Sequence, residues 1–262
     1  MHNICHAGIF TIAIGLVVAN LRRGGGLVES PPVLSHPSAS AMSATISYPQ
    51  VCQMLEGAVG QIRENHEMLS RLDSAVGDGD HGTTILRTME AVTKAIANYP
   101  GTDLKELFGK IGWDVMDCDG GSTGPLLGSF FMGMGDAAAG KTDLDCAALA
   151  TMIEGGILKL AKQSRATIGD KTMMDAFLPA LAALQTAAPA GNIRAALEQA
   201  AQAAAQGAEA TKQFRAKFGR ARNLGDRVIG HTDPGAVSVA LIFKGFSEAF
   251  PSSDSHPSVQ RT

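Results

Sequence analysis

Apolar residues recur at three- and four-residue intervals through most of the chain after Tyr48, which is the period of an amphipathic α-helix. The longest such stretch runs from Val51 to Leu69 and ends before a glycine-rich turn. The same spacing, with its breaks at glycine and proline, predicts further helices over about 83–98, 102–117, from 125 to about 139, 144–163, 171–188, 193–214 and 236–250. We therefore expect an all-α fold, a barrel or bundle of about eight antiparallel helices.

The strongest candidate for a β-strand is the segment "VSVALIF" at 237–243, which is short, apolar and rich in β-branched residues. It directly follows Asp233-Pro234-Gly235, and proline after aspartate is typical of a helix start. We therefore expect a helix there, and no convincing strand in the chain.

Polar, glycine-bearing segments separate the predicted helices, notably at 73–82, 119–125, 164–171 and 219–235. Alternate loops of an antiparallel bundle lie at the same end. The pattern therefore allows all four segments to share one face, which would be the functional end of the domain.

The first of these segments contains "AVGDGDHGTT" at 75–84 and concentrates negative charge in a chain that is only 18% charged. Asp73, Asp78 and Asp80 would repel one another unless a cation lies among them. Magnesium takes oxygen ligands and commonly bridges carboxylates to phosphate, and the glycines permit the tight turn that such convergence needs. The calcium-loop spacing is absent, since Met89 is twelfth from Asp78. A solvated loop with helix-capping aspartates is the alternative.

The second segment, "GGSTGP" at 120–125, offers backbone N–H groups and the hydroxyls of Ser122 and Thr123 at the start of a helix. Such a helix N-terminus binds anions. It is not a P-loop, because no Gly-Lys-Ser/Thr follows the glycines. Together the two segments favour a nucleotide phosphate bound with a metal ion.

Composition narrows the class of protein. Hydrophobic residues make up 45% of the 262 positions, enough for one domain with a sizeable core, and the net charge of −3 gives no basic surface for nucleic acid. The four cysteines show no zinc spacing and fit a reduced, cytoplasmic protein. The apolar run 8–21 is too short to span a membrane comfortably. We expect 1–47 to be a disordered or mis-assigned extension, 48–250 the domain, and 251–262 a flexible tail.

Four motifs resemble, in the same order, those of the nucleotide-binding domain of dihydroxyacetone kinases. They are "GDGDHG" at 77–82, "GGSTGPLLG" at 120–128, "GDKTMMDAFLPAL" at 169–181 and "GRARNLGDRVIGHTDPGAVSVALI" at 219–242. The resemblance covers about 48–250 and looks closest to the separate ADP-binding L subunits. The related fatty-acid-kinase domain is less similar, because that family has threonine where this chain has His81.

The resemblance implies a site of two groups of residues. Asp73, Asp78 and Asp80 match the aspartates that hold two magnesium ions. The residues matching nucleotide contacts are His81, Gly82, Thr83, Thr84, Ser122, Thr123, Ser164, Met173, Arg220, Asp233, Pro234 and Gly235. Met173 would pack on the adenine and 233–235 would lie beside the base or ribose, whereas Ser164 stands where the family often has glycine. No catalytic residue is assigned. The residues alone also allow Met173 to be a core residue and Arg220 to be a cation that caps the C-terminus of a helix.

The resemblance also implies a phosphotransfer subunit that binds ADP or ATP and works with a dihydroxyacetone-binding K-type subunit. A phosphohistidine carrier of the phosphotransferase system would re-phosphorylate a bound ADP coenzyme, whereas an ATP-exchanging form would need none. A different small ketose or tetrose as acceptor, and a non-catalytic nucleotide-loaded regulatory module, remain alternatives. A homodimer is also left open. We expect no membrane and no nucleic-acid partner.

Overall fold

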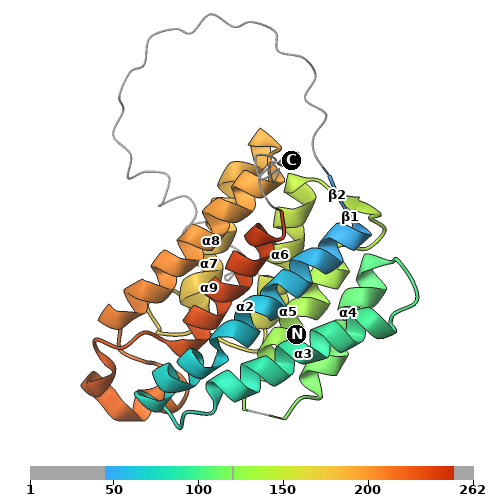
Figure 1. The fold of residues 1–262 in the computed structure, drawn as a ribbon. Helices are drawn as coiled ribbons and strands as arrows, with labels where there is room; N and C mark the ends of the chain where they lie inside the picture. Colours follow the sequence, from blue (N-terminus) through green and yellow to red (C-terminus); the bar gives the residue numbers. More distant parts are fainter. Residues whose placement is uncertain (1–44, 120, 251–262) are drawn as a thin grey trace, which may run out of the picture. The chain divides into compact units, whose positions relative to one another are not determined.

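The computed structural model describes residues 45–119 and 121–250 (Figure 1). Eight α-helices occupy these ranges: α2 (Tyr48–Ser74), α3 (His81–Asn98), α4 (Leu104–Met116), α5 (Thr123–Ala137), α6 (Cys146–Ala161), α7 (Met174–Ala187), α8 (Ile193–Ala210) and α9 (Pro234–Glu248). Three short 3₁₀ helices follow α7 and α8, namely η1 (Ala188–Ala190), η2 (Thr211–Gln213) and η3 (Arg220–Val228). The all-α prediction is confirmed. The predictions for 1–44 and 251–262 fall outside the described residues.

Each α-helix packs against the next one in sequence, and α9 packs against α2, so that the eight helices close into a ring. Figure 1 shows α9 and α2 side by side, although they lie at opposite ends of the domain's sequence. A chain of aromatic contacts runs through the interior and joins four of the helices. Its ring centroids lie 4.7–6.5 Å apart, through Phe108, Phe131, Phe130, Phe177, Phe243 and Phe246 in that order. The ring of helices is therefore a filled barrel.

Glycine allows the closest approach of helices where α9 meets α2. A Cβ atom on Gly57 would overlap the carbonyl oxygen of Gly245, and one on Gly245 would overlap the backbone of α2. Gly60, one turn further along α2, has nothing within 4 Å of such an atom. The closure of the barrel therefore depends on glycine at one crossing point, and not on a general preference for glycine along α2.

One short sheet contradicts the expectation that the chain contains no convincing strand. β1 (Ile46–Ser47) pairs antiparallel with β2 (Asp143–Leu144), with Ile46 opposite Leu144. Both of those side chains are buried. Two residues per strand give no alternating pattern, so the sequence carries no periodic sign of this pair.

Helix boundaries follow local capping chemistry. The Asp103 carboxylate accepts a hydrogen bond from the Glu106 amide at 2.9 Å and caps α4, which therefore begins at Leu104, two residues after the predicted start. Residues 237–243 lie within α9, which confirms the choice of helix over strand. Trp113 on α4 is 69% exposed, which excludes a role in the core.

Within residues 45–119 and 121–250, no helix combines the length and the apolar character needed to cross a bilayer.

Candidate functional site

The four glycine-bearing loops meet at one end of the barrel around a cavity of about 290 Å³. Its walls come from the end of α2 and the following turn, the first turns of α3 and α5, the loop before α7, the start of η3, and the start of α9. The volume is at the small end of the range typical for ligand pockets. Loops that are up to about 160 residues apart in sequence thus line one pocket, as the bundle argument allowed.

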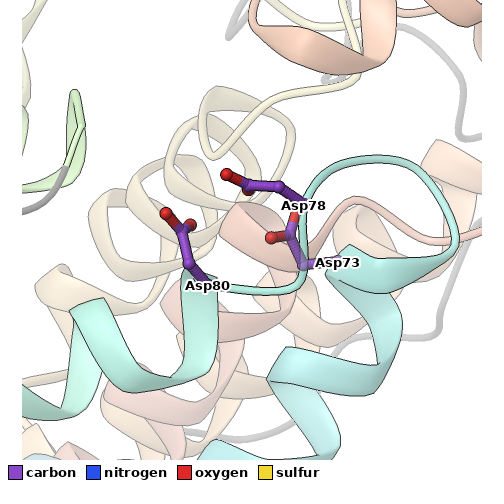
Figure 2. Close-up of side chains that lie close together, drawn as sticks. All are labelled: Asp73, Asp78 and Asp80. Atoms are coloured by element: carbon purple, nitrogen blue, oxygen red, sulfur yellow. The ribbon is translucent and has the colours of Figure 1, made fainter.

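Three carboxylates gather on one wall of this pocket. Asp73, Asp78 and Asp80 each offer an oxygen, and these oxygens all lie within 4.8 Å of one another (Figure 2). Asp73 also shapes the turn, since its Oδ2 accepts hydrogen bonds from the backbone N–H groups of Gly79 at 2.9 Å and His81 at 3.2 Å. Gly79 has φ +82°, in the left-handed region that glycine adopts without strain.

Arg220, the first residue of η3, reaches across the mouth of the pocket to this cluster. Its guanidinium forms an ion pair with Asp78 and lies 3.5 Å from Asp80. The carboxylate of Asp78, chiefly, raises the pKa of Arg220. One guanidinium against three carboxylates leaves an excess of negative charge within a few ångströms. Hard oxygen donors with uncompensated charge fit a divalent cation such as Mg²⁺.

At the two helix N-termini that face the carboxylates, the N-cap residue makes no capping hydrogen bond, although Asp73 accepts from the first N–H of α3, that of His81. The flanking residues of α3 and α5 are Asp80 and Ser122, and neither side chain accepts a hydrogen bond from its helix. The N-caps of α4, α6, α8 and α9 do so. Uncapped first-turn N–H groups at the positive end of a helix dipole are the groups that bind phosphate.

His81 begins α3 and is held by α9. Its Nε2 lies 2.8 Å from the Ser238 hydroxyl, which itself donates to the Pro234 carbonyl oxygen at 3.1 Å. Because the hydroxyl proton is used in that second bond, the hydroxyl accepts from His81 Nε2–H, and Nδ1 carries the lone pair in the neutral ring. Burial lowers the pKa of His81, although Asp73 and Asp80 raise it, so the neutral ring is favoured.

Several residues of the pocket lining are apolar, and we call them the apolar wall. It contains Leu126, Leu160, Met173, Phe218 and Pro234. Phe218 is 39% exposed beside the mouth, whereas Met174, which also lines the pocket, is buried. One cavity therefore combines an acidic wall, two helix N-termini and an apolar wall.

The structure brings most of the sequence-derived residues together. Lining the pocket are Asp73, Asp78, Asp80, His81, Thr84, Ser122, Thr123, Ser164, Met173, Arg220, Asp233, Pro234 and Gly235. Gly82 and Thr83 are not in the wall: Gly82 packs against the backbone of α2 at His66, and Thr83 is exposed. Gly82 is thus required where α3 crosses α2.

Among the residues of the pocket wall that sequence reasoning missed are Lys171 and Phe218. Lys171 was quoted only within a motif, and its burial could not be anticipated, because lysine is normally a surface residue. Phe218 stands alone in a polar loop, outside any periodic apolar pattern.

The fold and the pocket define a class, and comparison with known families identifies it: the chain belongs to the DAK2 domain family, whose model matches residues 75–248. Among its relatives is the ADP-binding subunit DhaL of PEP-dependent dihydroxyacetone kinase 1 from Listeria innocua, 37% identical over 70% of this chain and 87% of that protein. The DhaL subunit of the PEP-dependent enzyme of Escherichia coli is 32% identical over 68% of this chain and 85% of that one.

A solved structure gives the same answer for the fold. The dihydroxyacetone kinase of C. freundii in complex with AMP-PNP and Mg²⁺ matches 86% of this chain and 38% of its own, with a TM-score of 0.62 and 28% identity. The resemblance drawn from the four sequence motifs is therefore confirmed.

Proposed function

We propose that this chain is the ADP-binding phosphotransfer subunit of a dihydroxyacetone kinase that depends on phosphoenolpyruvate through the phosphotransferase system. The observation that carries the proposal is the meeting of the α5 N-terminus, whose N-cap side chain makes no capping bond, with three carboxylates in one cavity. Phosphate and a divalent cation are the ligands that satisfy both features together. The similarity to DhaL subunits over most of their length supports the same reaction.

Each wall of the pocket has a distinct part in this proposal. Asp73, Asp78 and Asp80 would hold Mg²⁺, which supplies charge neutralisation for the transferred phosphoryl group. The first-turn amides of α5, with the hydroxyls of Ser122 and Thr123, would bind the phosphates. The apolar wall would take the adenine, since stacking on apolar side chains suits a base and not a phosphate.

Arg220 and His81 have electrostatic parts and do not serve as bases. Phosphoryl transfer depends mainly on positioning and charge stabilisation. Arg220 stands at the mouth, where a guanidinium neutralises charge on a phosphoryl group as readily as on Asp78. His81, held by Ser238, presents a fixed imidazole at the α3 N-terminus and keeps the turn closed over the carboxylates.

The first experiment tests the metal and nucleotide site by calorimetric titration of ADP with and without Mg²⁺. We expect binding to require Mg²⁺ and to weaken by tenfold or more in Asp80→Asn, because a carboxylate ligand is lost. Asp143→Asn, which neutralises an exposed carboxylate on β2, is the matched control. Equal ADP affinity with and without Mg²⁺ would refute the assignment of the carboxylates.

The second experiment tests the division of labour between subunits. The chain alone should bind ADP yet fail to phosphorylate dihydroxyacetone, because in-line positioning of the acceptor is worth several kcal/mol and would be supplied by a substrate-binding subunit. Product formation is followed with a K-type subunit added, and then with a phosphohistidine carrier. Turnover that requires the carrier supports a resident ADP coenzyme. Rapid turnover by the single chain with ATP would overturn the subunit assignment.

A further inference from the structure

Lys171 is a buried cation in the lining of the pocket. The residue is only 2% exposed, although lysine is rarely buried without a specific reason. Its backbone φ of +58° is the only positive value for a non-glycine residue within the described ranges. Such a conformation is uncommon for a residue with a Cβ atom and persists where the surrounding structure holds it.

The ammonium group of Lys171 is used to join segments that are distant in sequence. Nζ donates to the carbonyl oxygen of Thr211, at 2.6 Å, and to that of His231. Thr211 follows α8, and His231 lies three residues before Pro234, the first residue of α9. The hydroxyl of Thr211 accepts from the Asp233 amide at 2.8 Å, which joins two of these three segments a second time.

Two carboxyl groups lie near the ammonium group without forming an ion pair with it. Burial lowers the pKa of Lys171, while Asp233 and Asp175 raise it. Asp175 in turn accepts from the amides of Gly169 at 2.6 Å and Thr172 at 2.7 Å, so it fixes the backbone on both sides of Lys171. The hydrogen bonds of Lys171 and Asp175 therefore fix the loop that carries Met173 relative to the segment that leads into the turn at 233–235.

We propose that Lys171 is a positioning residue for the nucleoside half of the ligand, because its enclosed ammonium holds the Met173 loop against the 233–235 turn. The inference rests on the proposed function, since it takes the apolar wall as the adenine site. Nothing in this network contacts the carboxylates at 73–80 or the α5 N-terminus. The two halves of the pocket meet through His81, whose imidazole lies 2.8 Å from the Ser238 hydroxyl in α9, and the Lys171 bonds lie on the nucleoside side of that contact.

The test compares two probes on Lys171→Met, which keeps the length of the side chain and removes the charge. We expect the affinity for ADP with Mg²⁺ to fall by about tenfold or more, the effect of losing charge-assisted hydrogen bonds. The affinity for magnesium pyrophosphate, which has no base, should stay within about twofold of the unmodified chain. A general loss of folded structure would weaken both probes alike, so their ratio reports positioning. Lys212→Met, at an exposed lysine beside Thr211, makes the same chemical change as a control and should alter neither affinity.

A second variant, Lys171→Gln, keeps hydrogen-bond donors without the charge and should show a smaller but selective loss of ADP affinity. Equal losses for ADP and pyrophosphate, or no loss in either variant, overturn the positioning role. If both variants fail to fold by circular dichroism, Lys171 supports the whole domain and the proposal is also wrong. Failure of the unmodified chain to bind ADP would instead refute the proposed function, which separates the two conclusions.

Discussion

Replacement of Asp233 by asparagine should make the stability of the domain less dependent on pH. Asp233 is the N-cap of α9, and its Oδ2 accepts from the Ala236 amide at 2.7 Å. Asparagine caps helices about as well as aspartate, so the substitution removes the charge and keeps the cap. Burial raises the pKa of Asp233 to about 7, with a further contribution from Asp175 and opposing effects of the Ala236 hydrogen bond and of Lys171.

The direction of this pH dependence follows from how tightly the folded and unfolded chains bind the proton. An aspartate in the unfolded chain has a pKa of about 3.9, so the folded protein holds this proton more tightly than the unfolded chain does. The neutral carboxyl therefore favours folding below about pH 4, and that contribution is lost as the pH rises through about 7. A difference of roughly three pKa units corresponds to at most about 4 kcal/mol.

Urea unfolding of both proteins from about pH 4 to about pH 8, without nucleotide or divalent cations, measures this contribution. Asp233→Asn should match the unmodified chain near pH 4 and exceed its free energy of unfolding by up to about 4 kcal/mol near pH 8. The difference should grow mainly between those limits. A difference that is constant with pH, or a variant that is less stable at the alkaline end, would contradict the assignment of a neutral, buried carboxyl.

Two further substitutions test packing and the histidine contact. Gly57→Ala should destabilise the domain by about 1–3 kcal/mol in urea unfolding, because the new methyl overlaps Gly245 across the α2–α9 crossing. The control Gly60→Ala, on the same helix, should be neutral or stabilising. Equal effects of the two substitutions would refute the packing argument. Ser238→Ala should cost about 1 kcal/mol and shift the imidazole ¹⁵N resonances of His81, whose tautomer it no longer fixes; unchanged resonances would show that the hydroxyl does not set the proton position.

The features that were predictable from the sequence are those encoded by neighbouring residues. The helical period extended through 237–243 despite their β-branched content, and the three carboxylates lie within eight positions of the chain, so their convergence needs only one turn. The contacts of Lys171 could not be found in this way, because its two acceptors lie 40 and 60 residues downstream and are backbone carbonyls of no particular residue type. The β1–β2 pair could not be predicted for the same reason, because each two-residue strand differs from a loop only in its pairing with the distant other strand.

The closure of the barrel by α2 and α9 has a topological consequence. α2 starts at β1 and ends at the acidic turn, and α9 starts at the pocket and ends beside the middle of α2, where Gln61 donates to Glu248 at 2.9 Å (Figure 1). The 27 residues of α2 make about 40 Å of helix, so both ends of the barrel's chain lie well away from the pocket mouth. A protein fused before β1 or after α9 would be attached away from that mouth, leaving it open to a docking subunit. Because α9 ends beside Gln61, about 20 Å of α2 separates its end from β1, so a circular permutant needs a linker that spans this distance.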